Sequence, residues 1–172
     1  MKRLLCVAVL ISSCLVVVGC DARGGEPGRH YEKDGGFSYV PPSGWKIIDF
    51  GGLKYKAVVG PAKDGFAVNL NCVEEAFTGT VEAYTEGSLA TLPKVFPTFR
   101  LLRREKFKTD KGLEGMKLIF ETDQQGRRLR QCGYFLPMNN KMLVITGSAL
   151  AQGGEGFDAV FDGAVKTFRL GK

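Results

Sequence analysis

The sequence predicts an α+β fold in which helices flank a central antiparallel sheet, and three features indicate it. Apolar and polar residues alternate in short segments between residues 37 and 147, as they do in half-buried strands. Several of these segments are joined by connections of hairpin length, which favour antiparallel pairing. A helical stripe of apolar residues closes the chain, and such a helix must pack on the sheet.

The first predicted strands lie between residues 37 and 73. The segment Phe37–Val40 alternates and stops at Pro41-Pro42-Ser43-Gly44, a turn cluster that cannot continue a ladder. Residues 45–49 are extended again. Apolar residues then alternate with Lys in 53–59 and with Asn in 66–72, which predicts two half-buried strands.

A helix of about a dozen residues is predicted to begin at Thr80, a good N-cap residue, and to end or bend at Pro93. Its apolar face consists of Val81, Tyr84, Leu89 and Leu92.

A second block of strands follows, and a helix closes the chain. In the extended run 99–108, Phe99, Leu101 and Phe107 are predicted to share one face, with basic residues on the other. Strands are then expected at 116–120, 128–136 and 142–147. The closing helix is predicted over 155–167, with an apolar stripe of Phe157, Val160, Phe161, Ala164, Val165 and Phe168.

The beginning of the chain has the layout of a bacterial lipoprotein signal. Lys2 and Arg3 precede an apolar stretch, residues 4–18, that is shorter than the roughly 20 residues needed to span a bilayer. Val17-Val18-Gly19-Cys20 resembles a lipobox, in which the cysteine is diacylated and becomes the first residue. Ile11-Ser12-Ser13-Cys14 is a weaker match, because processing there would leave an apolar segment on the mature protein.

Residues 1–19 are therefore predicted to be a signal peptide, residues 20–35 a lipidated tether and residues 36–172 one domain. Gly24-Gly25 and Pro27-Gly28 give the tether its flexible composition. Two acyl chains suffice for stable attachment to a membrane. The predicted location is the cell membrane, with the domain facing the periplasm or extracytoplasmic space.

Composition excludes some classes of partner. A formal net charge of +6, of which Lys2 and Arg3 supply two, is too small to indicate nucleic-acid binding. A hydrophobic fraction of 44% argues against disorder. The predicted partners are therefore the membrane and an envelope protein.

The opening Gly36-Phe37-Ser38-Tyr39-Val40-Pro41-Pro42-Ser43-Gly44-Trp45 resembles that of the PsbP-like family, which includes bacterial DcrB-type lipoproteins. There, too, a short strand, a proline-glycine turn and a tryptophan begin the domain. The order of later elements is similar, up to a closing helix that ends in Lys166-Thr167-Phe168. The resemblance implies an α/β/α sandwich around an antiparallel sheet, but no shared activity, because fold does not determine function.

Cys72 and Cys132 would remain as a pair after processing, in a compartment that permits disulfides. A bridge between them would close a loop of about 60 residues and stabilise the fold by about 4 kcal/mol. The alternative is two separately buried thiols that act as small apolar residues.

The sequence offers no catalytic or metal-binding motif. His30, the one histidine, falls in the predicted tether, so a nucleophile in the domain would have no histidine base. No cysteines have metal-ligand spacing, and no cofactor is expected. Glu74 and Glu75 are adjacent, and neighbouring residues of an extended chain point to opposite faces. We therefore predict a protein that is not an enzyme.

A basic set is the strongest candidate for a binding face, either for anionic headgroups or for an acidic partner. Ordinary solubilising surface is the alternative. The set consists of Arg100, Arg104, Lys106, Lys108, Arg128 and Arg130.

The predicted function is binding or scaffolding by a membrane-anchored envelope lipoprotein. A thiol redox protein using Cys72 and Cys132 is an alternative, although redox thiols usually occur as Cys-x-x-Cys. A small-ligand carrier is another, and a pocket between the sheet and the closing helix would favour it.

Overall fold

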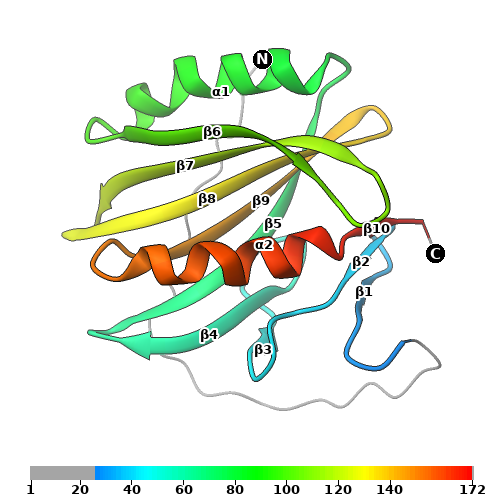
Figure 1. Cartoon of the computed structure of the whole chain (residues 1–172), viewed down its shortest axis with the longest axis horizontal. Coiled ribbons are helices and arrows are strands. Elements are labelled where there is room, and N and C mark those ends of the chain that lie inside the picture. Colours follow the sequence, from blue (N-terminus) through cyan, green and yellow to red (C-terminus); the bar gives the residue numbers. More distant parts are fainter. Residues whose placement is uncertain (1–25, 172) are drawn as a thin grey trace.

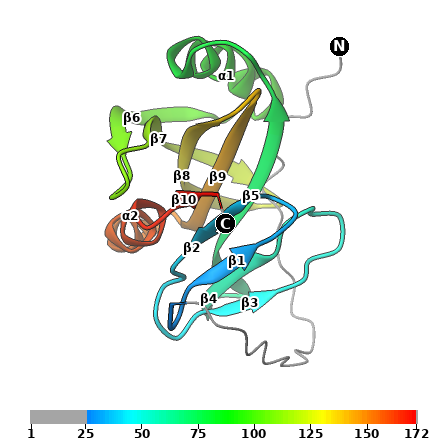
Figure 2. The ribbon, with the colours of Figure 1, turned by 90° about the vertical axis from the view of Figure 1, so that its right-hand side faces the viewer.

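A seven-stranded antiparallel sheet forms the central layer of the protein, with one helix on each face (Figures 1 and 2). The structure, a computed structural model, describes residues 26–171. The predicted signal peptide, residues 1–19, and the lipidation residue Cys20 lie outside the described residues. The elements are β1 His30–Glu32, β2 Phe37–Tyr39, β3 Lys46–Ile48, β4 Ala57–Lys63, β5 Phe66–Ala76, α1 Val81–Val95, β6 Arg100–Lys108, β7 Glu114–Gln124, β8 Arg127–Met138, β9 Lys141–Leu150, the 3₁₀ turn η1 Gly154–Phe157, α2 Asp158–Lys166 and β10 Arg169–Leu170.

The strands of the large sheet run in the order β3-β4-β5-β9-β8-β7-β6, and each neighbouring pair is antiparallel. Two-residue turns join β4 to β5, β7 to β8 and β8 to β9. Asp64-Gly65 and Gln125-Gly126 have positive φ at both positions, and Asn139 has a φ of 51°. Such left-handed turns match the twist of antiparallel hairpins, which explains the long meander from β7 to β9.

Each helix covers its own hydrophobic core. Phe161, Val165 and Phe168 bury their side chains with Tyr134 and Ile145 on one face of the sheet. On the other face, α1 contributes Leu92 to a cluster whose sheet residues are Met116, Leu118, Phe120, Phe135, Met142 and Val144. Since the strands present apolar side chains to both faces, the fold is an α/β/α sandwich. This confirms the fold class predicted from the sequence.

The helix predictions are confirmed, with small shifts at the ends. Thr80 caps α1 by accepting a hydrogen bond from the backbone N–H of Ala83 at 3.1 Å. Pro93 lies inside the last turn of α1 rather than ending it. The closing helix begins as η1 and continues as α2. Among the described residues, neither helix combines the length and hydrophobicity needed to cross a membrane.

A second, three-stranded sheet joins the N-terminal and C-terminal ends of the described chain, in the order β1-β2-β10. His30–Glu32 pairs with β2, and the Arg29 guanidinium donates to the carbonyl oxygen of Thr167 at 3.0 Å. The prediction that residues up to 35 form a tether is therefore wrong for 30–32. A three-residue strand is too short to show alternation, and its partner β2 is equally short.

Two strand predictions also need correction. Leu53 and Tyr55 precede β4, and their alternation reflects loop packing, because the buried Tyr55 hydroxyl donates to Glu74 at 2.7 Å. A β-bulge between Leu101 and Arg103 interrupts β6. Leu101 therefore lies on the α1 face, whereas Phe107 packs on Tyr134 on the α2 face.

Candidate functional site

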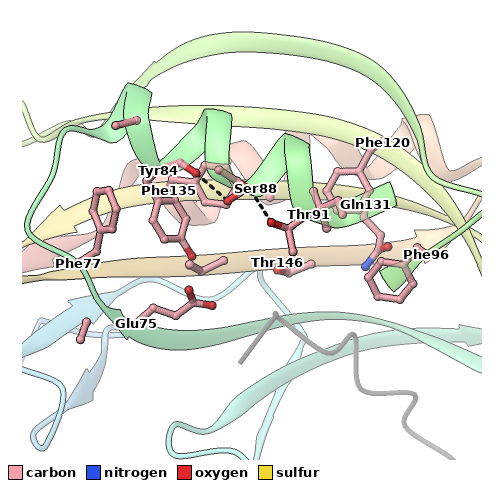
Figure 3. A pocket seen from close by; sticks show the side chains of 16 residues that line it. Glu75, Phe77, Tyr84, Ser88, Thr91, Phe96, Phe120, Gln131, Phe135 and Thr146 are labelled. Atoms are coloured by element: carbon pink, nitrogen blue, oxygen red, sulfur yellow. Dashed lines mark hydrogen bonds between the residues drawn. The ribbon is translucent and has the colours of Figure 1, made fainter. Parts of the chain in front are cut away.

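A cavity of about 100 Å³ lies between α1 and the sheet (Figure 3). It exists because the part of α1 above the sheet carries small side chains. Gly87 has no side chain, and the hydroxyls of Ser88 and Thr91 donate back to carbonyl oxygens of their own helix, at 2.9 and 2.7 Å. Small side chains bound to their own backbone cannot fill the space down to the strands.

Aromatic side chains form the apolar walls of the cavity. Tyr84 contacts both Phe77 and Phe135 edge to face, with ring centroids 5.1 Å apart in each pair. Phe96 and Phe120 lie toward the other end, as Figure 3 shows. The walls therefore present mainly ring surface, which suits an apolar or aromatic ligand group.

The sheet supplies a polar floor on the same face. Gln131 is 2% exposed and accepts from the Thr122 hydroxyl at 2.9 Å, while its amide donates to Ser148 at 3.2 Å. Thr146 lines the cavity beside Gln131. Asn71 pairs in register with Thr146 but does not itself line the cavity; it is 3% exposed, and neither of its side-chain polar atoms has a hydrogen-bond partner.

The sequence offered only a weak signal for the buried polar residues of β5. The alternation of Asn69 and Asn71 with apolar residues predicts a solvent-facing side of the strand, yet both are buried. They lie in β5, a central strand covered on both faces. A polar residue at such a position is informative only once the strand order is known.

A second polar cluster holds α2 against the opposite face of the sheet. The Lys117 ammonium, 3% exposed, lies 2.7 Å from Asp162 and 3.2 Å from Glu105, and the buried Tyr134 hydroxyl donates to Asp162 at 2.6 Å. Burial alone would lower the pKa of Lys117, but its hydrogen bond and ion pair with Asp162 outweigh burial and raise that pKa. All these charges are satisfied internally, so this cluster is structural.

Cys72 and Cys132 form no disulfide, which corrects the bridged alternative. They lie on β5 and β8, and β9 runs between these strands. Two strand spacings separate their backbones by about 10 Å, beyond the roughly 7 Å that a disulfide can span. Burial, followed by the charge of Asp158, raises the pKa of the Cys132 thiol and so disfavours the reactive thiolate.

The predicted basic face is divided between the two sides of the sheet. Arg104, Lys106 and Lys108 lie on the α1 side, in register with Leu118, Met116 and Glu114. The Arg100, Arg128 and Arg130 side chains lie on the other side. Five of the six have acidic partners, namely Arg100 with Glu121, Arg104 with Glu86, Lys108 with Glu114, Arg128 with Glu121 and Asp123, and Arg130 with Asp158. The bulge in β6 causes this division, so the six residues do not act as one binding face.

Glu74 and Glu75 point to opposite faces, as predicted. Glu75 lines the cavity, whereas Glu74 binds Lys54 at 2.6 Å and Lys141 at 2.9 Å. Burial alone would raise the pKa of Glu74, but hydrogen bonds from Lys54, Tyr55 and Lys141 lower it to about 2. The two carboxylates therefore cannot act together on one substrate.

His30 lies in β1 with its Nε2 2.7 Å from a carboxylate oxygen of Glu32. Its ring packs edge to face on Tyr39, so it serves the small sheet. Within residues 26–171, no three of His, Cys, Asp and Glu are grouped so that they could hold a metal ion.

No model of a known protein family matches the chain, and no curated protein matches it significantly. Several solved structures, in contrast, resemble the chain in fold. Cyanobacterial PsbP (CyanoP) from Synechocystis matches with a TM-score of 0.62 and 14% identity, over 89% of this chain and 98% of that one. LpqN, involved in cell envelope biogenesis of Mycobacterium tuberculosis, matches with a TM-score of 0.62 and 12% identity, over 87% and 88%. PA94 from Pseudomonas aeruginosa, a protein of unknown function, matches with a TM-score of 0.57 and 15% identity, over 72% and 94%. The chain thus has a PsbP-like fold, as the resemblance of residues 36–45 predicted.

Proposed function

We propose that this protein is a non-enzymatic lipoprotein of the cell envelope, held on the membrane by a diacylated Cys20, with a PsbP-like domain that binds a partner outside the cytoplasm. The observation that carries the proposal is the lipobox-like Val17-Val18-Gly19-Cys20 at the end of a short apolar segment. LpqN, a protein of similar fold that is involved in cell envelope biogenesis, supports the location.

The position of β1 fits this anchoring. Eight residues lie between Cys20 and Arg29, which binds the folded domain through Thr167. An extended chain covers at most about 3.5 Å per residue, so the small sheet would stay within roughly 30 Å of the acylated cysteine. The anchor would therefore hold the domain close to the headgroups, where an envelope protein partner can reach it.

The side chains of the domain support a binding role over a catalytic one. His30 contacts Glu32 and Tyr39 and lies in the small sheet, away from the cavity. Glu75 is the one carboxylate in the cavity lining, which includes no histidine, cysteine or lysine. A general acid–base pair or an activated nucleophile would need a second such group nearby.

Intact mass spectrometry of the membrane-extracted chain tests the anchor. After alkylation without reductant in denaturant, the wild-type chain should begin at Cys20, carry two acyl chains and have two alkylated thiols. Cys20→Ala should abolish acylation, whereas the matched Cys14→Ala variant should retain it. An unacylated wild-type chain, or acylation lost with Cys14→Ala alone, would refute the assignment of Cys20.

A small-ligand carrier is the second candidate, and the cavity favours it. A pocket beside the closing helix would have favoured this role; the cavity instead lies under α1, where Gly87 and Ser88 leave space above the strands. The thiol redox alternative lacks comparable support, because Cys72 and Cys132 are buried on strands that are not neighbours.

A further inference from the structure

We infer that the small sheet β1-β2-β10 is the surface through which the domain contacts an anionic membrane, with Tyr31 and Leu170 among the lipid headgroups and with Lys111 and Arg169 facing their phosphates. This rests on the proposed membrane location and adds to it a defined orientation of the domain.

Exposed apolar side chains are concentrated on this sheet. Tyr31 and Leu170 are 41% and 40% exposed, and they are two of the five exposed large apolar side chains within residues 26–171. The three strands of the sheet contribute only three, three and two residues. Both side chains line one shallow hollow. A tyrosine ring is favourable at the level of lipid headgroups, because its hydroxyl stays in water while the ring leaves it.

The charged residues that line the same hollow are all basic. Tyr31 on β1 and Arg169 on β10 both lie directly opposite Ser38 in the register of β2, so their side chains share one face of the sheet. Arg29 and Lys111 complete the lining, which contains no carboxylate. Basic side chains beside exposed apolar ones are typical of a surface that binds anionic lipid.

One nearby carboxylate competes with lipid for these cations. Glu26 lies 2.9 Å from Arg29 and 2.8 Å from Arg169, so a single negative charge serves two guanidinium groups. The Arg29 side chain is 3% exposed and is part of the folded structure. The Arg169 side chain is 36% exposed and can therefore also reach a headgroup phosphate.

Lys111 supplies a cation that no acidic residue holds. It is exposed in the connection between β6 and β7, and it forms no ion pair within residues 26–171. Its neighbour Asp110 is also exposed, but so is Lys166, whose carbonyl oxygen accepts from the Asp110 N–H at 2.8 Å. These two opposite charges offset each other, and the surface keeps an excess of positive charge that complements an anionic bilayer.

The predicted anchor leads to this same surface. Five residues lie between Cys20 and Glu26, so an extended chain would keep Glu26 within about 20 Å of the acylated cysteine. The connection from β6 to β7 reaches β10, whereas the start of β6 lies at the opposite end of the domain (Figure 1). Leu101, near that start, is seven residues before Lys108, which corresponds to about 23 Å along the strand. The anchor therefore favours contact through the small sheet rather than through the end that carries Leu101.

Quenching of a fluorescent label by the bilayer measures which end lies on the membrane. A bimane is attached to Leu170→Cys or to the matched control Leu101→Cys, since both leucines are 40% exposed. Cys72 and Cys132 are buried, so only the introduced cysteine should react in the native chain. The labelled full chain, extracted from membranes, is reconstituted into vesicles with a spin-label quencher in their headgroups. The vesicles are phosphatidylcholine alone, or phosphatidylcholine with about one third anionic phosphatidylglycerol.

In anionic vesicles the label at position 170 should be quenched about fivefold more strongly than the label at position 101. Neutral vesicles or high salt should reduce quenching at position 170 by about twofold or more, because the attraction to headgroups is absent or screened. Lys111→Glu should reduce it by a similar factor. Lys94→Glu is the matched control, because it reverses an exposed lysine in the last turn of α1, and it should leave the quenching unchanged.

Equal quenching of the two labels, or stronger quenching at position 101, would overturn the inference. So would equal effects of Lys111→Glu and Lys94→Glu. If Leu170→Cys does not fold by circular dichroism, Tyr31→Cys, which is 41% exposed on the same sheet, takes its place.

The intact mass of the same sample reports acylation of Cys20 separately. An acylated chain without preferential quenching refutes the orientation and leaves the anchor in place. An unacylated chain refutes the anchor, and the comparison of the two labels still decides whether the small sheet binds an anionic bilayer.

Discussion

Replacing Asp162 by Ala should destabilise the protein more than replacing Lys117 by Met, although the two side chains form one ion pair. The reason is their unequal burial. The Lys117 side chain is 3% exposed, whereas Asp162 and Glu105 are 29% and 38% exposed. Asp162→Ala leaves a buried ammonium beside a single carboxylate, whereas Lys117→Met leaves two carboxylates that water can reach.

The magnitudes follow from these exposures. Removing one partner of a buried ion pair costs about 3–5 kcal/mol, and the remaining Glu105, 3.2 Å from Lys117, favours the lower end for Asp162→Ala. Loss of the acceptor for the Tyr134 hydroxyl adds about 1 kcal/mol, for a total of about 4 kcal/mol. Lys117→Met keeps the apolar stem and loses only charge-assisted hydrogen bonds, about 2 kcal/mol.

Urea unfolding followed by circular dichroism measures all three free energies, including that of the double variant. The double variant has no buried ammonium left unpaired, so it should lose about 3 kcal/mol of unfolding free energy, less than Asp162→Ala alone. The coupling energy between the two substitutions should be about 2–3 kcal/mol. Lys108→Met is the control, because its pair with Glu114 is exposed and should contribute less than about 1 kcal/mol. Additive costs in the double variant, or a larger cost for Lys117→Met than for Asp162→Ala, would refute the reasoning.

Three further predictions concern packing, pH and the thiols. Gly147→Ala should lower the free energy of unfolding in urea by about 1–3 kcal/mol, because its Cβ would lie 2.5 Å from the Phe161 ring. Gly163→Ala is the control, since a Cβ there meets nothing within 4 Å, and an equal cost of the two substitutions would contradict the prediction. The pKa of Glu74 in the folded chain, about 2, lies below its usual 4.5, so its contribution to the free energy of unfolding is fully present above pH ~4.5 and is lost as the pH falls toward 2. Glu74→Gln should therefore make the free energy of unfolding less dependent on pH in that window. An unchanged pH dependence would count against the Lys54 and Lys141 contacts. Cys132 should resist thiol reagents in the native state, because it is buried, and should react once the chain is unfolded without reductant. If Cys132 does not react in the unfolded chain, its thiol is not free.

Local patterns were enough to predict most of the elements. The stripe from Phe157 to Phe168 predicted the closing helix, and connections of hairpin length at residues 123–126 and 137–140 predicted antiparallel pairing, because helical periodicity and turn chemistry depend on nearby residues. The bulge at Leu101 could not be predicted in this way. A single inserted residue reverses every later side chain in the strand, and only pairing with β7 reveals it.

The candidate sites depended much less on local sequence. The basic residues from Arg100 to Arg130 suggested one face, but the bulge divides them between the two faces. Cys72 and Cys132 suggested a bridge, but strand order places β9 between them. Both questions concern distances between segments far apart in the chain, which alternation and composition do not encode.

Local sequence patterns were enough to predict the class of fold, the two helices, the hairpins and the opposite orientation of Glu74 and Glu75, because each follows from the geometry of a short stretch of backbone. Tertiary structure alone decided that Asn71 is buried opposite Thr146, that Lys117 lies beneath α2, and that a cavity remains under α1. Burial and hydrogen-bond satisfaction are properties of neighbours brought together by strand order, and a polar residue acquires its significance only when those neighbours are known.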